Sequence, residues 1–165
     1  RHFRVANNRV SAIPLEDLVE RIQDQIRRHR EWLVRYRKHR GRVGPVAGYA
    51  MEFVVERQRL GVLEELKYGR GMVRIGVSRW TLEPEPDLET ESIEQACRQG
   101  SMFYNTLSGI SPETTLTFWV YEDSFAEYRR LQRLVQEAGF TVAARPLPPG
   151  ASISGSPRGS KSAAQ

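Results

Sequence analysis

The residues between Thr115 and Leu147 constrain the fold more than any other part of the chain. An alternating apolar run begins at Leu116 and is typical of a mostly buried strand, because aromatic and β-branched residues favour pleated surfaces. Gly139 then suits a left-handed helix end, and alternation resumes at Phe140. Between them, apolar residues recur at spacings of three and four, which marks one helix face: Phe125, Tyr128, Leu131, Leu134 and Val135. The stretch therefore predicts a β-α-β unit over residues 115–147.

Two helix starts carry a capping box, in which a serine side chain and a residue three positions later satisfy each other's backbone N–H groups. Ser124 with Glu127 predicts one at the start of the central helix, and Ser92 with Gln95 predicts another. We expect the second helix to reach Leu107. A third helix is predicted from about Leu15 to His39, because apolar residues follow a helical stripe through this segment.

The remaining patterns indicate strands. Asn7-Asn8 suits a hairpin turn, because asparagine tolerates positive φ. Alternation predicts further strands over residues 49–56 and 72–82, whereas residues 58–71 fit either a helical turn or a hairpin arm. The expected fold is α+β, with a single mixed sheet of about five to six strands and about three helices packed on it. One globular domain is expected over residues 1–147, followed by a Pro/Gly/Ser-rich tail over residues 148–165.

Composition excludes several kinds of site. No apolar run approaches the ~20 residues that a membrane helix needs, so we expect no membrane segment in this sequence. Cys97 is the only cysteine, which rules out an internal disulfide and favours a buried structural thiol. The acidic residues between Glu83 and Glu94 fit a cation site or a solvated loop, and the loop is favoured. His29 and His39 lie too far apart along one predicted helix to share a metal.

Catalytic patterns are also missing from the sequence. Ser101 with Asn105, and Glu122 with Asp123, are polar groups near predicted element ends. Asp123 also precedes a predicted helix start, where a carboxylate favours the helix dipole. No Ser/His/Asp order, HExxH or GxGxxG pattern accompanies these residues. We therefore expect no enzyme activity, no catalytic residues, no cofactor and no metal.

Net charge of +5 is concentrated at the two ends of the chain, whereas the centre is acidic overall. The predicted helix over residues 21–42 is rich in arginine, and such a face neutralises phosphates or acidic surfaces. Trp32 and Tyr36 could stack on bases, although both also fit the apolar stripe. In the tail, residues 155–161 could cradle an anion, but a solvent-exposed tail is favoured. The candidate anion or nucleic-acid contacts are Arg27, Arg28, Arg30, Arg35, Arg37, Lys38, Arg158 and Lys161.

Several segments spread over the chain are similar to segments of the proteins of one family. They are Val43 to Tyr49, Arg79-Trp80, Thr117 to Phe125, Pro148 to Gly150 and Ile153 to Gln165. Together they make the chain resemble an uncharacterised family of bacterial proteins that end in a Gly-Ser-Pro-Arg-Gly-Ser type of tail. The resemblance implies a C-terminal globular domain of a longer, coiled-coil-containing protein. It implies no activity, because the family has none established.

The predicted function is therefore a non-enzymatic structural or protein-interaction domain, expected to be the C-terminal module of a larger bacterial protein. The alternative is nucleic-acid or anionic-surface binding through the basic helix 21–42. The chain begins with Arg rather than Met, so we expect an excised or processed fragment of a longer protein. We expect this fragment to be soluble, because no membrane segment is predicted in it. Its compartment is open: cytoplasmic, or envelope-associated if the full-length protein carries an anchor. The partner and the oligomeric state are not specified by these patterns.

Overall fold

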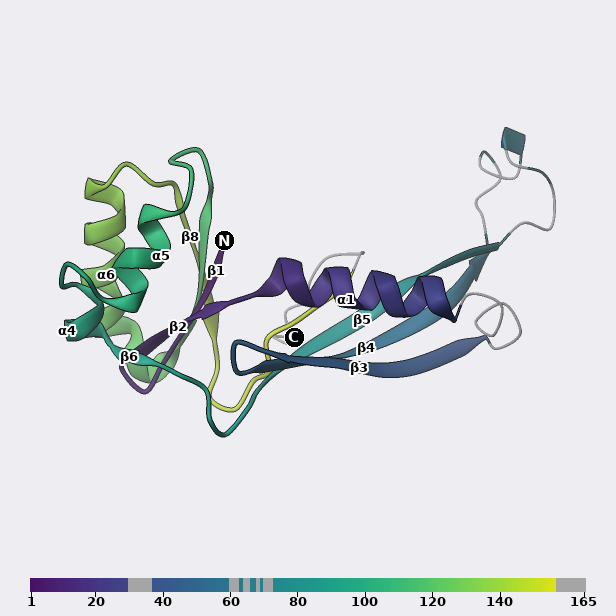
Figure 1. Ribbon diagram of the computed structural model, residues 1–165, viewed down its shortest axis with the longest axis horizontal. Helices are drawn as coiled ribbons and strands as arrows, with labels where there is room; N and C mark the ends of the chain where they lie inside the picture. The colour runs from purple at the N-terminus through teal and green to yellow at the C-terminus, as the bar shows by residue number, and fades with distance from the viewer. Residues whose placement is uncertain (30–36, 60–62, 64–65, 68, 70–72, 157–165) are drawn as a thin grey trace. The chain divides into compact units, whose positions relative to one another are not determined.

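The computed structural model describes residues 1–29, 37–59, 63, 66–67, 69 and 73–156 (Figure 1). Contacts between these residues divide the chain into two compact units. The first comprises residues 1–15 and 86–151, and the second comprises residues 16–85 and the segment that begins at Ser152. No helix among the described residues is long and apolar enough to cross a membrane.

The predicted α+β class is confirmed, and a mixed sheet is present. Within the described residues, however, the strands form a five-stranded and a four-stranded sheet rather than a single sheet of five to six strands, and the predicted domain 1–147 is divided between two units. The physical reason is that alternation identifies a half-buried strand without specifying the strand that pairs with it.

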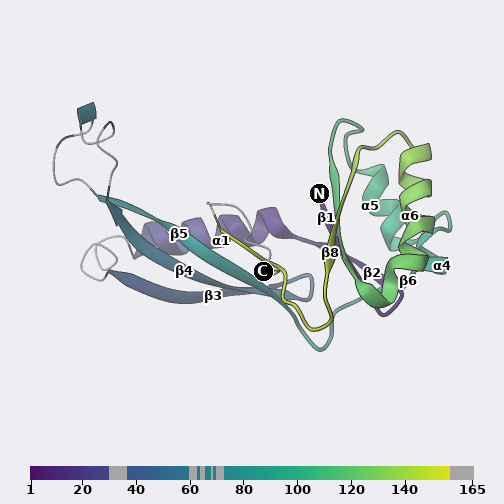
Figure 2. The same ribbon diagram turned by 180° about the vertical axis from the view of Figure 1, so that it is seen from behind.

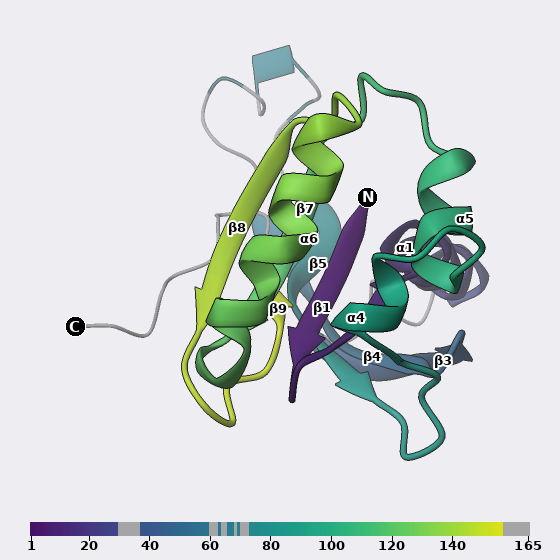
Figure 3. The same ribbon diagram turned by 90° about the vertical axis from the view of Figure 1, so that its left-hand side faces the viewer.

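The first unit is built on a mixed sheet in the order β6-β2-β1-β7-β8. β1 pairs antiparallel with β2 and parallel with β7, and β7 pairs parallel with β8. Figure 3 shows α4, α5 and α6 on one side of this sheet. The predicted β-α-β unit is therefore present as β7, α6 and β8. The elements are β1 (His2–Ala6), β2 (Arg9–Ile13), β6 (Glu91–Ser92), α4 (Ile93–Ala96), α5 (Met102–Ser108), β7 (Leu116–Tyr121), η1 (Glu122–Ser124), α6 (Phe125–Glu137) and β8 (Val142–Leu147).

Aromatic rings fill the space between this sheet and its helices. Phe3 stacks on Phe118 with ring centroids 5.1 Å apart, and Phe103 meets Phe3 edge to face at 5.0 Å. Tyr128 from α6 lies 5.4 Å from Phe118. Phe125, which the helical spacing assigned to the buried face, is instead 39% exposed at the start of α6.

The N-terminal hairpin has the predicted turn. Asn7 and Asn8 adopt φ values of 53° and 56°, which suit a two-residue connection between twisted strands. The turn is held from outside, because Asn7 N–H donates to Asp123 Oδ2 at 3.0 Å and Asn8 N–H donates to Ser124 Oγ at 2.9 Å. Ser124 is fully buried and makes no side-chain cap bond. The capping box predicted at Ser124 is therefore wrong, because its hydroxyl is committed to the hairpin.

The capping box predicted at Ser92 is confirmed. Gln95 N–H donates to Ser92 Oγ, and Ser92 N–H donates to Gln95 Oε1, both at 3.2 Å. The prediction of one helix reaching Leu107 is wrong, because α4 ends at Ala96 and a separate α5 follows. Gly100 at φ +82° turns the chain, and Ser101 then accepts the Tyr104 N–H at 3.0 Å as the new N-cap.

The second unit is an antiparallel sheet in the order β3-β4-β5-β9, with α1 running along one face (Figures 1 and 2). Leu18 and Ile22 are the buried residues of α1. From Met51 to Val55 the buried side chains of β4, Met51, Phe53 and Val55, alternate with the more exposed Glu52 and Val54. This alternation gives the sheet a covered face toward α1 and a second, open face. The elements are α1 (Leu15–Arg28), β3 (Lys38–Val46), β4 (Tyr49–Arg59), β5 (Val73–Pro84) and β9 (Ser154–Gly155).

The predicted helix from Leu15 to His39 is shorter than expected. α1 ends at Arg28, and β3 begins at Lys38, so the described end of the predicted basic helix is a strand. From Lys38 to Val43 each residue pairs with one of β4 in continuous register. The lysine and arginines of this segment recur at a spacing of two, which is the period of a strand. Residues 30–36 lie outside the described residues.

Part of the predicted tail forms a strand. Ser154 pairs with Thr81 and Gly155 pairs with Trp80, so β9 lies along β5. The preceding Ile153 is 3% exposed, and its carbonyl accepts the Leu82 N–H at 2.8 Å. Burial of this isoleucine explains why a segment rich in small polar residues is ordered here. Residues 157–165 lie outside the described residues.

Glycines at both edges of this sheet accommodate aromatic rings. Gly41, Phe53, Trp80 and Gly155 form one row of directly paired residues across β3, β4, β5 and β9. A Cβ atom at Gly41 would lie 2.5 Å from Phe53 Cζ, and one at Gly155 would lie 2.4 Å from Trp80 Cζ2. Each ring therefore covers a glycine on the neighbouring strand, which leaves no room for a side chain at either position.

Candidate functional site

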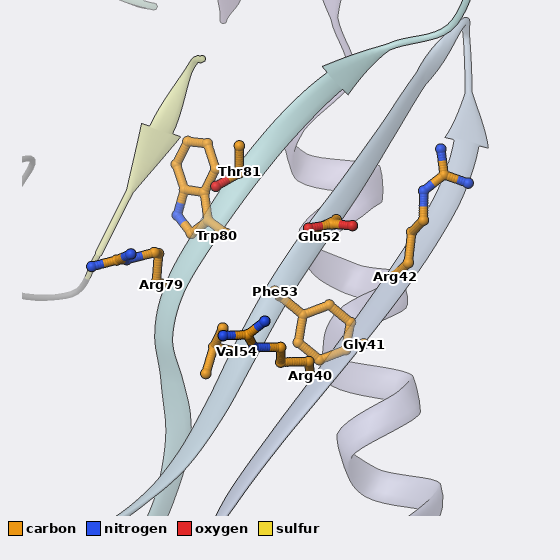
Figure 4. A pocket seen from close by; sticks show the side chains of 9 residues that line it. All are labelled: Arg40, Gly41, Arg42, Glu52, Phe53, Val54, Arg79, Trp80 and Thr81. Atoms are coloured by element: carbon orange, nitrogen blue, oxygen red, sulfur yellow. The ribbon is translucent and has the colours of Figure 1, made fainter. Parts of the chain in front are cut away.

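The open face of the second sheet holds a hollow of about 510 Å³ (Figure 4). Its lining comes from three consecutive residues on each of β3, β4 and β5: Arg40, Gly41, Arg42, Glu52, Phe53, Val54, Arg79, Trp80 and Thr81. Because side chains alternate along a strand, the central residue of each triplet contributes backbone to the floor, while its neighbours supply side chains to the walls. In Figure 4 α1 lies behind the strands, so the hollow is on the face away from the helix.

Cross-strand register places the wall residues in two rows. Arg40, Val54 and Arg79 form one row, with the valine on the central strand between the two arginines. Arg42, Glu52 and Thr81 form the other row in the same strand order. Adjacent strands lie ≈ 4.8 Å apart, so the two outer Cα atoms of a row are separated by roughly 10 Å. In the first row, therefore, two guanidinium groups lie on either side of the apolar Val54 side chain.

The basic residues around the hollow differ in their partners. Arg42 forms ion pairs with Glu83 at 3.5 Å and with Glu85 at 2.5 Å. On the same face, Lys38 forms an ion pair with Glu56 at 3.1 Å. In contrast, the side chains of Arg40 and Arg79 are exposed and have no ion pair or hydrogen bond within the described part of the chain.

This arrangement of basic side chains is suited to binding an anionic group. A guanidinium group presents a planar fork of N–H donors that matches a carboxylate or phosphate group. The hollow adds one carboxylate from Glu52 and one hydroxyl from Thr81. Searched over the described residues alone, the chain brings together no group of three or more His, Cys, Asp or Glu side chains that could hold a metal ion.

Among the residues that the structure describes, the predicted anion-binding residues lie at two places, the last turn of α1 and the start of β3. Arg27 and Arg28 lie in the last turn of α1, where Arg27 forms an ion pair with Asp24. Arg37 precedes β3, and its carbonyl accepts the Arg57 N–H at 3.0 Å. Of the described members of the predicted set, Lys38 lies on the open face, beside the hollow. Arg30, Arg35, Arg158 and Lys161, together with Trp32 and Tyr36, lie outside the described residues.

The other polar residues singled out in the sequence have structural partners. Glu91 accepts the Met102 and Phe103 N–H groups at 2.7 and 2.8 Å, and Glu94 forms an ion pair with Arg98. Asn105 donates to the Gly100 carbonyl at 3.3 Å. These contacts place part of the acidic segment, and the Ser101–Asn105 pair, at helix ends rather than in a shared pocket.

Cys97 ends α4 and packs against the core of the first unit. Burial raises the pKa of its thiol; the Arg130 charge acts in the opposite direction, and Glu127 adds to the increase. A nucleophilic cysteine needs a stabilised thiolate, so these surroundings favour the structural role that the sequence predicted.

The first unit also contains arginines beside aromatic rings. Arg4 lies 5.1 Å from the centre of the Tyr121 ring, and Arg145 lies 5.0 Å from that of Trp119. His2 stacks on Trp119 at 6.3 Å and accepts its indole N–H at 3.3 Å. Trp119 is only 6% exposed, so its ring is engaged inside the unit rather than offered to a ligand.

Sequence reasoning missed Arg79, Glu52 and Thr81 and assigned Arg40 to a helix. The available signal was the spacing of two between Lys38, Arg40 and Arg42, which is a strand period. Pairing these residues with Glu52 and Arg79 required the sheet register, which a single sequence does not contain.

Comparison with known proteins adds nothing to this description: no family model, no curated protein and no solved structure matches the chain. The resemblance to an uncharacterised bacterial family therefore stays a prediction, and the geometry of the hollow is the basis for a functional proposal.

Proposed function

We propose that this chain is a non-catalytic protein-interaction module whose docking surface is the hollow on the open face of β3, β4 and β5. The observation that carries the proposal is the pair of exposed arginines, Arg40 and Arg79, which flank Val54 without ion-pair partners among the described residues. Such groups gain more from a carboxylate partner than arginines that are already paired. The hollow fits an acidic side chain with a small apolar neighbour.

The signs of the surrounding charges favour a protein partner over a nucleic acid. Glu52 lies in the wall of the hollow, while Glu56 and Glu83 lie on the same face. A continuous phosphate backbone is repelled by carboxylates on the same face as the arginines, whereas a protein surface can present an acid and a base in a matching order. The alternative of nucleic-acid binding through a basic helix has less support, because α1 ends at Arg28.

Charge reversal of the two unpaired arginines tests the proposal. The probes are a fluorescein-labelled peptide of alternating Glu and Val residues and a labelled DNA oligonucleotide, measured by fluorescence anisotropy at low salt. We expect the peptide to bind, and the double variant Arg40→Glu/Arg79→Glu to lose about tenfold or more in affinity. The matched control is Arg27→Glu/Arg28→Glu, which makes the same change of charge on the exposed end of α1 and should leave affinity nearly unchanged.

Equal peptide affinity for the Arg40/Arg79 variant and the wild type would show that the hollow is not the docking surface. Tighter binding of DNA than of the peptide, lost in the Arg27/Arg28 variant, would instead favour the nucleic-acid alternative. Circular dichroism of each variant checks that the sheet is retained.

A further inference from the structure

β3 is an edge strand of the second sheet. Within the described residues it pairs with β4 on one side and with no strand on the other. An edge strand presents backbone N–H and C=O groups that another strand can join.

The hydrogen-bond pattern identifies the outward groups. Arg57 N–H donates to the Arg37 carbonyl at 3.0 Å, so residue 37 belongs to a hydrogen-bonded pair. Antiparallel strands alternate between hydrogen-bonded and non-hydrogen-bonded pairs. The continuous register then makes Lys38, Arg40 and Arg42 the residues whose backbone groups point away from β4.

The same three residues carry the basic side chains of β3 on the open face. Lys38 and Arg42 are partly neutralised by Glu56 and by Glu83 and Glu85, whereas Arg40 between them is unpaired in the described structure. A strand placed beside β3 would have its side chains about 5 Å from these Cβ atoms. The edge of β3 therefore offers outward backbone groups to a neighbouring strand. It also places the positive charge of Arg40 close to that strand's side chains.

We propose that the partner docks by adding an extended acidic segment to β3, so that its backbone pairs with Lys38, Arg40 and Arg42 and its carboxylates face the Arg40 side chain at the β3 rim of the hollow. This inference rests on the proposed function and names the partner's chemistry and conformation. The register between β3 and β4 shifts after Val43, so the straight part of the edge, and hence the docked segment, covers residues 38–43.

Charge complementarity selects this occupant over the alternatives. A second copy of the chain pairing through β3 would bring Lys38, Arg40 and Arg42 against the same cationic residues, which is unfavourable in a cross-strand pair. A nucleic acid has no peptide backbone to continue the ladder. An acidic segment satisfies both the outward backbone groups and the unpaired guanidinium group.

The experiment compares an end-blocked Glu/Val peptide with two N-methylated forms of it. One form is methylated at alternate residues on one edge of the peptide, and the other form is methylated on the opposite edge. If the peptide adds to β3, one methylated form loses about tenfold or more in affinity and the other retains it, because only one edge donates to β3. Amide exchange at Lys38, Arg40 and Arg42 should slow on binding.

A matched pair of protein variants tests the backbone separately. Arg40→Ala and Arg40→Pro both remove the guanidinium group, but only proline also removes the outward N–H, and proline is tolerated on an edge strand where the N–H faces solvent. Strand addition predicts weaker binding to Arg40→Pro than to Arg40→Ala.

Equal binding of both methylated peptides, together with lost binding in the Arg40/Arg79 charge-reversal variant, would overturn strand addition and leave the hollow as the docking surface. Failure of all the peptides to bind at millimolar concentration would overturn both proposals.

Discussion

Substitution of Gly155 by alanine gives a sharp test of how β9 is held. A Cβ atom at this position would lie 2.4, 2.6 and 2.9 Å from three atoms of the Trp80 indole. These distances are shorter than real Cβ contacts, and the atoms belong to a rigid ring on a paired strand. We therefore expect alanine to push β9 off β5, or to displace the indole that covers it.

The cost can be bounded from what β9 contributes. Detachment exposes the Ile153 side chain, which is 3% exposed in the structure, and full burial of such a side chain is worth about 1.5–3 kcal/mol. It also breaks the backbone bond from Leu82 N–H to Ile153, worth about 1 kcal/mol net. Partial adjustment of the indole would reduce the loss, so we expect about 1–3 kcal/mol.

The assay is urea unfolding of the second unit, combined with amide exchange at Leu82. Gly155→Ala should lower the free energy of unfolding and speed Leu82 exchange. The control is Gly76→Ala, in the same strand β5, where a Cβ atom meets nothing within 4 Å and no positive φ is required. Unchanged Leu82 exchange in Gly155→Ala, or equal losses in the two variants, would refute the proposed packing of Trp80 on Gly155.

Four further predictions concern the first unit. The Tyr128 hydroxyl is buried and has no hydrogen-bond partner in the described structure, so Tyr128→Phe should leave the free energy of unfolding unchanged or raise it by about 1 kcal/mol in urea. Burial raises the pKa of Tyr128, so the free energy of unfolding should fall as the pH rises above the unfolded-state tyrosine pKa of about 10. In a pH series, the Tyr128→Phe variant should not show this part of the fall. Burial also raises the pKa of the Cys97 thiol, so iodoacetamide should alkylate it more slowly near pH 8 than it alkylates an unstructured cysteine peptide. Ser124→Ala should cost about 1–3 kcal/mol and speed amide exchange at Asn8, because the Asn8 N–H loses its acceptor; unchanged exchange would contradict this.

The sequence was informative where local rules determine structure. The asparagine turn, the Ser92 capping box and the β-α-β unit after Leu116 depend on residues close together in the chain, and all three are present. Ser124 carries the same capping signal as Ser92, but its hydroxyl bonds to a hairpin more than a hundred residues away. Tertiary contacts therefore overrode an equally good local signal.

The candidate site could not be predicted for a related reason. Lys38 and Arg40 were assigned to a helix because the apolar stripe before them continues at helical spacing. Their own spacing of two was visible, but the hollow also needs Val54 and Arg79 opposite Arg40. Cross-strand register depends on pairing and turn geometry along the whole sheet, so the composition of one strand does not specify it.

The chain passes between the two units at residues 15, 85 and 151, so the first unit is interrupted by most of the second. β3, β4 and β5 follow one another in sequence, so they can pair into a sheet as soon as they are synthesised. β1, by contrast, must wait for β7, and closing so long a loop carries a larger entropic cost. During synthesis we therefore expect the sheet of the second unit to form first. β1 can pair with β7 only late in translation, after β7 has been synthesised.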